Sequence, residues 1–204
     1  MVGSGKGPFA PSGDGSVFIA TMYSFGKDPV CVGVDGIVTC MGVFLAHGGM
    51  LYAIHVPFQA SATNDLGREA FIAYVHREDP NFQGANAKLY GVTNNNARGT
   101  AVDEVRQYAK SLKVDYTVFC QLRENLGDKK SPDAAAVVCE LLGGHGPVLK
   151  YQKHSTANWQ AGPGVRRAGH YHNGSMADIL AVPNTDVASG WQLVNAGNSD
   201  LKLL

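Results

Sequence analysis

The sequence predicts an α/β or α+β fold, in which a layered β-sandwich carries flanking helices. Short runs rich in β-branched and aromatic residues recur between turns that contain Gly or Pro, as in a protein with many strands. Two longer segments place apolar residues at helical spacing. The 204 residues are 45% apolar and 17% charged, which suits one globular domain. We expect residues 1–15, rich in Gly, Ser and Pro, to be flexible and residues 16–204 to form that domain.

The elements are predicted in order from these patterns. Residues 16–24 and 30–34 are typical of strands, and residues 25–29 (F-G-K-D-P) of a turn between them. Residues 34–58 form two strand-like runs around a glycine-containing turn, which predicts a β-hairpin. The remaining expectations are a helix over 63–76 capped by Thr63 or Asn64, a strand over 87–92, a helix capped by Thr100, strands over 114–122, 134–142 and 148–152, turns at 127–132 and 143–147, a long loop over 153–173, and closing strands over 177–182 and 191–195.

The hairpin brings a cysteine and a histidine together. If His47 and Gly48 form the tip of its turn, Cys40 lies directly opposite His55 on the neighbouring strand. Directly opposed residues on one face have Cβ atoms about 5 Å apart, so a thiol and an imidazole can meet. The same register pairs Gly42 with Ala53, and it predicts an open notch beside the pair for a long, thin side chain.

Alternation along the two strands assigns their faces. One face is apolar and is expected to be the core side, so the face of Cys40 and His55 is expected to look outward or into a cleft. The predicted core set is Met41, Val43, Leu45, Tyr52, Ile54 and Val56.

Charge and cysteine content narrow the function classes. Lys plus Arg equals Asp plus Glu at 17 each, which does not favour nucleic acid or an anionic membrane as partner. No run approaches the roughly 18 apolar residues of a membrane span, and the first residues lack the apolar core of a secretory signal peptide. We expect a monomer made in a cytoplasm, and any secretion to proceed without a cleaved signal.

The four cysteines show neither C-x-x-C nor zinc-type spacing, and we expect them to be thiols. Cys31, Cys120 and Cys139 are expected in the core. Cys31 is the rival nucleophile to Cys40, but no histidine is placed opposite it.

The motifs between residues 34 and 122 follow one another in a recognisable order. A cysteine strand, a glycine turn and a histidine strand precede a helix, the strand A-K-L-Y-G-V with Asn94-Asn95-Asn96 after it, a helix ending at Leu112-Lys113-Val114, and then residues 115–122 and a short hairpin. This order resembles the protein-glutamine deamidases that include CheD, the cytotoxic necrotizing factor catalytic domain and the Burkholderia lethal factor type toxins. The resemblance covers about residues 30–152, and residues 153–204 have no counterpart.

The resemblance implies a layered sandwich fold and hydrolysis of the side-chain amide of a glutamine on a partner protein, without a cofactor. By position it makes Cys40 the nucleophile and His55 the base. The third position of the family site is Val34, which can offer only its carbonyl, and Asp35 beside it is the alternative. The family has Gly or Ser-Gly before the cysteine, whereas this chain has Val38-Thr39. This departure and the unmatched C-terminal residues 153–204 favour a bacterial effector over a CheD-like enzyme acting on chemoreceptors.

Other interpretations stay open at this stage. Transglutamination or peptide cleavage would use the same residues, with an oxyanion bound by the amide of Cys40 or one near Gly36. A non-catalytic module would bind its partner through the loop over 153–173. His170 and His172, with His154 or His145, are a possible half of a metal site, whereas the glycine-rich residues 3–7 lack the spacing of a phosphate loop.

Overall fold

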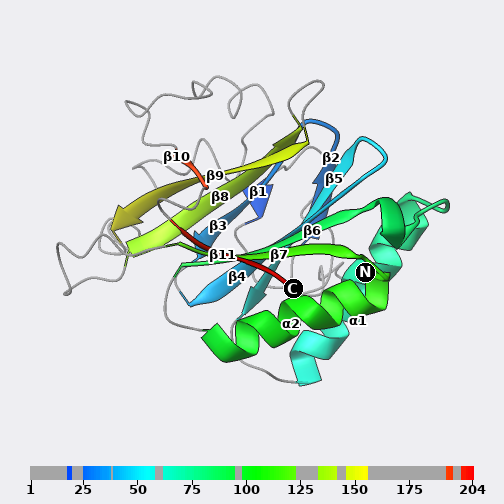
Figure 1. The fold of residues 1–204 in the computed structure, drawn as a ribbon, viewed down its shortest axis with the longest axis horizontal. Coiled ribbons are helices and arrows are strands. Elements are labelled where there is room, and N and C mark those ends of the chain that lie inside the picture. The colour runs from blue at the N-terminus through cyan, green and yellow to red at the C-terminus, as the bar shows by residue number, and fades with distance from the viewer. Residues whose placement is uncertain are drawn as a thin grey trace, which may run out of the picture.

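A computed structural model describes residues 18–19, 25–37, 39–57, 62–94, 98–122, 133–141, 146–155, 192–194 and 199–204. Within these ranges the chain is mixed α+β, with two β-sheets, two α-helices and one short 3₁₀ helix (Figure 1). The strands are β1 (Phe18–Ile19), β2 (Phe25–Asp28), β3 (Cys31–Ile37), β4 (Cys40–His47), β5 (Met50–Pro57), β6 (Lys88–Thr93), β7 (Tyr116–Leu122), β8 (Asp133–Leu141), β9 (Pro147–Ser155), β10 (Gln192–Leu193) and β11 (Ser199–Leu203). The helices are α1 (Ala62–Glu78), η1 (Gly84–Asn86) and α2 (Arg98–Leu112).

The strands of the described ranges divide into a six-stranded sheet A and a five-stranded sheet B. Sheet A has the order β11-β7-β6-β4-β5-β2, and sheet B the order β1-β3-β8-β9-β10. In sheet A, β6 and β7 are parallel and are joined through α2, whereas the β4–β5 hairpin is antiparallel. The chain therefore alternates between sheets: β3 belongs to sheet B, and β4 to β7 belong to sheet A.

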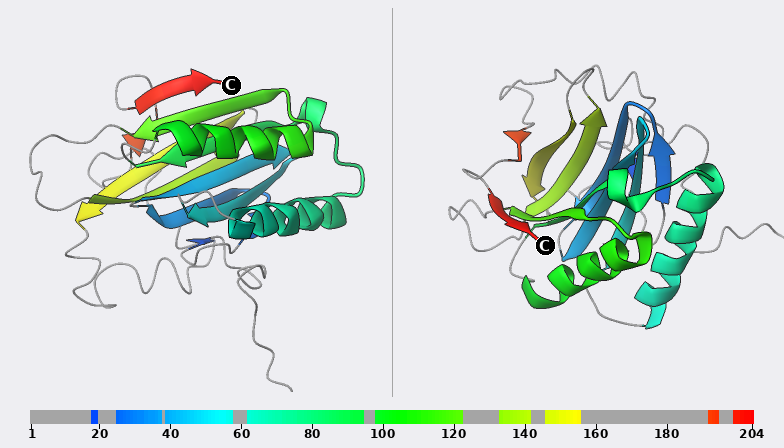
Figure 2. Two further views of the ribbon diagram at one scale, coloured as in Figure 1. Left: turned by 90° about the horizontal axis from the view of Figure 1, so that it is seen from below. Right: turned by 45° about the vertical axis from the view of Figure 1, so that its right-hand side comes forward.

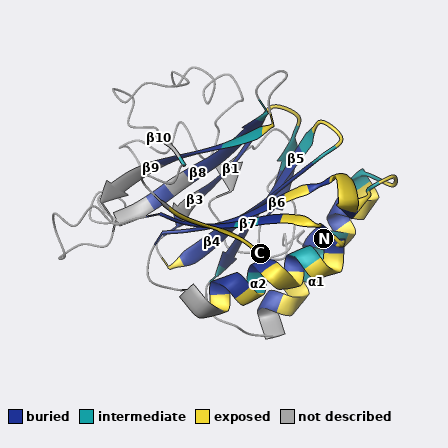
Figure 3. Cartoon of the chain, in the orientation of Figure 1, coloured by how far each residue is buried: buried dark blue, intermediate teal, exposed yellow. Residues whose placement is uncertain are grey.

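The molecule is layered as helices, sheet A and sheet B. Both helices lie against one face of sheet A (Figure 2), and the other face packs on sheet B through a second apolar cluster that contains residues of both sheets. The helix-side cluster contains all six residues predicted for the core face of the hairpin. Figure 3 shows the resulting pattern, with buried strands and with helices exposed on the side away from the sheet.

Close packing of α2 on sheet A depends on a glycine. Gly91 in β6 lies directly under the helix, and a Cβ at this position would overlap Val105 of α2. Val105 is fully buried, as are Phe71 of α1 and Leu89 of β6 in the same cluster. The small residue therefore sets how closely the helix approaches the strand.

Most predicted elements of the described ranges are confirmed, with four differences. Helix α1 begins at Ala62, so the predicted caps Thr63 and Asn64 lie inside the helix. Residues 25–28 form an edge strand paired with β5 instead of the predicted turn, and the structure adds β11, which the sequence did not predict. Helix α2 begins at Arg98, before the predicted cap Thr100. The predicted turns at 127–132 and 143–145, the closing strand over 177–182, most of the loop over 153–173 and residues 1–15 lie outside the described residues.

Candidate active site at the open end of a hairpin

The hairpin register differs from the prediction by two residues. Gly48 and Gly49 form the tip, with φ of +57° and +79°. A two-residue turn of this kind needs positive φ at both positions, which glycine adopts without strain and His47 would not. Cys40 therefore lies opposite Pro57, and His55 lies opposite Gly42.

Cys40 and His55 nevertheless share a face of sheet A, because a slip of two residues preserves alternation. They are diagonal neighbours, for which the separation is about 7–8 Å between backbones and less between side chains. The predicted direct opposition is wrong, and a contact between thiol and imidazole now requires both side chains to lean toward each other.

The face of Cys40 and His55 is covered, contrary to the expectation that it looks outward. Cys40 is 4% exposed and His55 is 2% exposed. Sheet B packs on this face, where Phe44, Leu51 and Ala53 of the same hairpin join its residues in the second cluster. Alternation identified the two faces of the hairpin correctly but could not show that both are buried.

The predicted notch is also filled. Gly42 faces His55 rather than Ala53, and a Cβ on Gly42 would lie 2.8 Å from Cε2 of Phe44 and 3.3 Å from Cδ1 of Ile37. These two apolar side chains therefore occupy the space above the glycine. A substrate side chain reaching Cys40 along this line would have to displace one of them.

A β-bulge in β3 lies next to this site. Val34 pairs with Val137 of β8, but Ile37 pairs with Ala135, so that Asp35 and Gly36 together face one residue. Bulges of this kind interrupt the ladder and are frequent beside active sites. Val34 is fully buried in the cluster between the sheets, and Ile37, directly after the bulge, borders Gly42.

Two buried asparagines hold the main chain on either side of the Cys40 and His55 pair, at the ends of β3 and β5. The Asn94 side chain, after β6, donates from Nδ2 to the carbonyl of Ile37 at 3.2 Å, three residues before Cys40. The Asn64 side chain of α1 donates from Nδ2 to the carbonyl of Pro57 at 3.3 Å, two residues after His55. The asparagines are 4% and 2% exposed. The bond of Asn94 is buried and that of Asn64 is partly buried. Both fix the main chain of the site through its carbonyl oxygens.

The Asn64 anchor extends into an ionic network between the helices. The carboxylate of Glu104 in α2 hydrogen-bonds Asn64 and forms an ion pair with Arg68 of α1 at 2.9 Å. Burial raises the pKa of Glu104 above its usual range, although Arg68 acts in the opposite direction. Sequence reasoning treated Asn64 as a possible helix cap and missed this role, because Asn64 lies inside α1 and nothing in the local sequence marks its contact with β5.

The remaining cysteines are structural. All four are free thiols, as predicted, and the burial expected for Cys31, Cys120 and Cys139 is confirmed, whereas Cys40 is buried contrary to expectation. Burial raises the pKa of Cys120 to about 12 and raises the pKa values of Cys31 and Cys139 further, with Glu140 adding to the effect at both. Because the thiolate is the nucleophile, these environments oppose reactivity and argue against Cys31 as the nucleophile.

The described residues contain no group of three or more His, Cys, Asp or Glu side chains that could hold a metal ion. The four histidines of the predicted half-site fall where side chains are not described. No helix in the described ranges is long and apolar enough to cross a membrane.

Comparison with protein-family models and with curated proteins finds no match for this chain.

Proposed function

We propose that this protein is a cysteine-dependent protein-glutamine deamidase of the CheD and necrotizing-factor type, acting as a bacterial effector on a partner protein. The observation that carries the proposal is the arrangement of Cys40 and His55 on the same face of adjacent strands, near the open end of the hairpin. The bulge in β3 and the two asparagine anchors support it, because catalytic groups need a main chain held in fixed geometry.

The reaction is an acyl transfer in two steps. The Cys40 thiolate attacks the carbon of the glutamine amide, and the tetrahedral oxyanion collapses to a thioester as ammonia leaves with a proton from the His55 imidazolium. The neutral imidazole then takes a proton from water, which attacks the thioester and releases glutamate and the Cys40 thiolate. One water is consumed and one ammonia is produced, so the reaction needs no cofactor.

Main-chain N–H groups near the bulge are candidates for stabilising the oxyanion. Asp35 and Gly36 share one partner residue across the ladder, so at least part of this main chain is outside regular pairing. Val34 would contribute its carbonyl to orient His55, with Asp35 as the alternative. Both roles are part of the proposal.

A non-catalytic binding module is the second candidate, and burial favours it. Cys40 and His55 are almost fully covered, and Phe44 and Ile37 fill the space beside them. In this interpretation the pair is an ordinary part of the sandwich core, and the protein acts only by binding.

The two candidates are separated by Cys40 chemistry. We would follow alkylation by iodoacetamide between about pH 6 and 9, reading each cysteine by peptide mass, because an ion-paired thiolate reacts well below the usual thiol pKa of about 8.5. Cys31, Cys120 and Cys139 serve as buried controls in the same digest. Preferential reaction of Cys40 near pH 6.5, lost in His55→Gln, supports the enzyme. A Cys40 as inert as the other three contradicts it.

Activity is then tested on candidate partner proteins. Wild-type protein, but not Cys40→Ser, should release ammonia and convert one glutamine to glutamate, detected by the mass of the peptide. A cross-link to an added amine instead of hydrolysis would identify transglutamination by the same residues.

A further inference from the structure

Strand β11 forms one edge of sheet A, and within the described ranges only β7 pairs with it. The main-chain N–H of Leu204, directly after β11, donates to the carbonyl of Thr117 at 3.0 Å. Because hydrogen-bonded and non-hydrogen-bonded pairs alternate in an antiparallel ladder, Lys202 and Asp200 also direct their main-chain groups toward β7. The main-chain groups of the intervening residues point to the outer edge, namely those of Ser199, Leu201 and Leu203.

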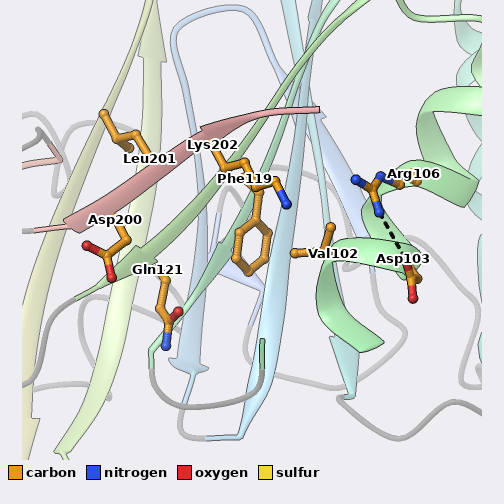
Figure 4. A pocket seen from close by; sticks show the side chains of 8 residues that line it. All are labelled: Val102, Asp103, Arg106, Phe119, Gln121, Asp200, Leu201 and Lys202. Carbon is orange, nitrogen blue, oxygen red and sulfur yellow. Dashed lines mark hydrogen bonds and ion pairs between the residues drawn. The ribbon is translucent and has the colours of Figure 1, made fainter. Parts of the chain in front are cut away.

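The side chains of β11 separate by charge onto its two faces. Asp200 and Lys202 project to the helix side, where they line a pocket of about 560 Å³ between α2, β7 and β11 (Figure 4). In the same view Leu201 leaves the strand on the side away from Asp200. Leu201 and Leu203 are 47% and 69% exposed. The edge therefore offers outward main-chain groups next to exposed leucines.

An open edge of this kind is a template for a further strand, and exposed apolar side chains beside it favour an interaction site. Many proteins protect such an edge with lysine, because like charges meet when two copies pair. Here Asp200, two positions before Lys202 on the same face, balances its charge. The charges of β11 therefore do not prevent two copies of it from pairing.

Two antiparallel copies of β11 match in one register. With Leu201 on the two-fold axis, Asp200 of each copy lies opposite Lys202 of the other, in a non-hydrogen-bonded pair, where side chains are closest. Displacement by two residues in either direction places Asp200 opposite Asp200 or Lys202 opposite Lys202. Asp200 already takes part in an interaction within its own chain, and the register requires only the sign of its charge.

The same register covers the exposed leucines. Leu201 lies opposite Leu201 of the second copy, and their outward main-chain groups form the central hydrogen bonds. Leu203 is a diagonal neighbour of Leu201 in the second copy, within reach of a long side chain. On the inner side both leucines adjoin β7, where they pair with Val118 and Cys120. Pairing would therefore bury apolar surface that one chain leaves in water.

We propose that two copies of this chain associate through antiparallel pairing of their β11 strands, in place of the monomer expected from the sequence. The contact is two-fold symmetric, and it joins the two A sheets into one continuous sheet. Because a strand of five residues covers little area, the interface belongs to the weak class below about 1,200 Å². The pockets of the two copies then lie on the same face of the joined sheet, on either side of the axis.

The test is sedimentation equilibrium of the full chain over a concentration series up to about 1 mM. We expect the mass to rise with concentration toward that of two chains. Asp200→Lys and Lys202→Asp each place like charges opposite one another, so each should weaken association about tenfold. An equimolar mixture of these two variants restores both opposite-charge pairs and should associate as tightly as wild type.

Two controls separate pairing at β11 from a general charge effect. Glu69→Lys and Lys110→Asp make the same charge changes at exposed positions of α1 and α2, and neither they nor their mixture should change association. Leu201→Pro removes an outward N–H but no hydrogen bond to β7, so it should abolish association, whereas Leu201→Ala keeps that N–H and should only weaken it. Circular dichroism establishes that each variant retains the fold, and the charge variants suffice if Leu201→Pro does not.

Several outcomes would overturn the proposal. These are a wild-type chain that stays single throughout the series, a mixture of the two β11 variants that associates no more tightly than either alone, equal effects in the control variants, or unchanged association in a folded Leu201→Pro. Cys40 and His55 are retained in every variant. The result is therefore independent of whether the protein is a deamidase.

Discussion

The two ends of the β4–β5 hairpin each carry a histidine, but the two histidines are held in different ways. At the tip, His47 Nδ1 lies 2.6 Å from a carboxylate oxygen of Asp79, and the main-chain N–H of Gln83 donates to Nε2 at 3.4 Å. Since Nε2 accepts, Nδ1 carries the proton and donates it to Asp79. The ring also packs against Phe82 at a tilt of 60°, with centroids 4.7 Å apart. Both ring nitrogens of His47 therefore connect the hairpin to the segment between α1 and η1.

At the open end the anchoring is done by other residues. Asn94 and Asn64 hold the carbonyls of Ile37 and Pro57, so residues other than Cys40 and His55 contribute to fixing the strands there. His47 is thus itself part of the anchor at the tip, whereas His55 lies between the anchors that Asn94 and Asn64 make. The following predictions test this distinction.

The largest difference is expected for Cys40 reactivity. His55→Gln should reduce the rate of Cys40 alkylation at pH 6.5 by up to about 100-fold, because an unassisted thiol with a pKa near 8.5 is only about 1% ionised there. His47→Gln is the matched control, because it removes the same ring from the other end of the hairpin and should leave the rate unchanged. Equal effects of the two substitutions would mean that His55 has no special relation to Cys40.

The register explains why the residue pair could be predicted but its environment could not. Alternation and two strand-like runs are local properties, and they assigned Cys40 and His55 to one face even though the tip was displaced. The burial of this face depends on β3, which directly precedes the hairpin in the chain, and on β8 and β9, which return to it from a distant part of the chain. Small residues such as Gly42 and Ala53 suit an open notch and a packed sandwich equally well.

Strand β11 was missed for a related reason. Its sequence, S-D-L-K-L, alternates charged and apolar residues, and Leu201 and Leu203 are 47% and 69% exposed. Such an edge strand has little apolar burial to mark it, and its pairing with β7 joins segments about 80 residues apart. The pocket that it completes was therefore not predictable from either segment alone.

The next effect concerns the asparagine anchors. Asn94→Ala should lower the free energy of unfolding by about 1–3 kcal/mol, because it leaves the buried carbonyl of Ile37 without this donor. It should also slow Cys40 alkylation, since the main chain before Cys40 loses its anchor. Chemical denaturation and alkylation measure the two effects, and Asn86→Ala at exposed η1 is the control. A loss of stability without any change in alkylation would make Asn94 purely structural.

A smaller effect is expected from the buried thiols at alkaline pH. Their folded pKa values are raised, so between about pH 8.5 and 10 the unfolded chain releases protons that the folded chain retains. Stability should therefore fall by about 1 kcal/mol per pH unit for each such thiol. When chemical denaturation is measured across this pH range, the free energy of unfolding should fall less steeply with pH in Cys139→Ala than in wild type. If Cys40 is already a thiolate at pH 8.5, the change in unfolding free energy with pH should be the same in Cys40→Ala as in wild type. A smaller change, as expected for Cys139→Ala, would contradict the paired thiolate.

The smallest effect is expected at the tip. Asp79→Asn keeps a side-chain oxygen that can accept from His47 Nδ1 but removes the charge, and the pair is partly exposed, so the loss of stability should be below about 1 kcal/mol. Because the tip lies seven residue pairs along the ladder from Cys40, the alkylation rate should not change. A slower rate in Asp79→Asn would mean that the hairpin transmits changes from one end to the other. His47 would then belong to the same functional unit as His55, and the distinction between the two histidines would no longer hold.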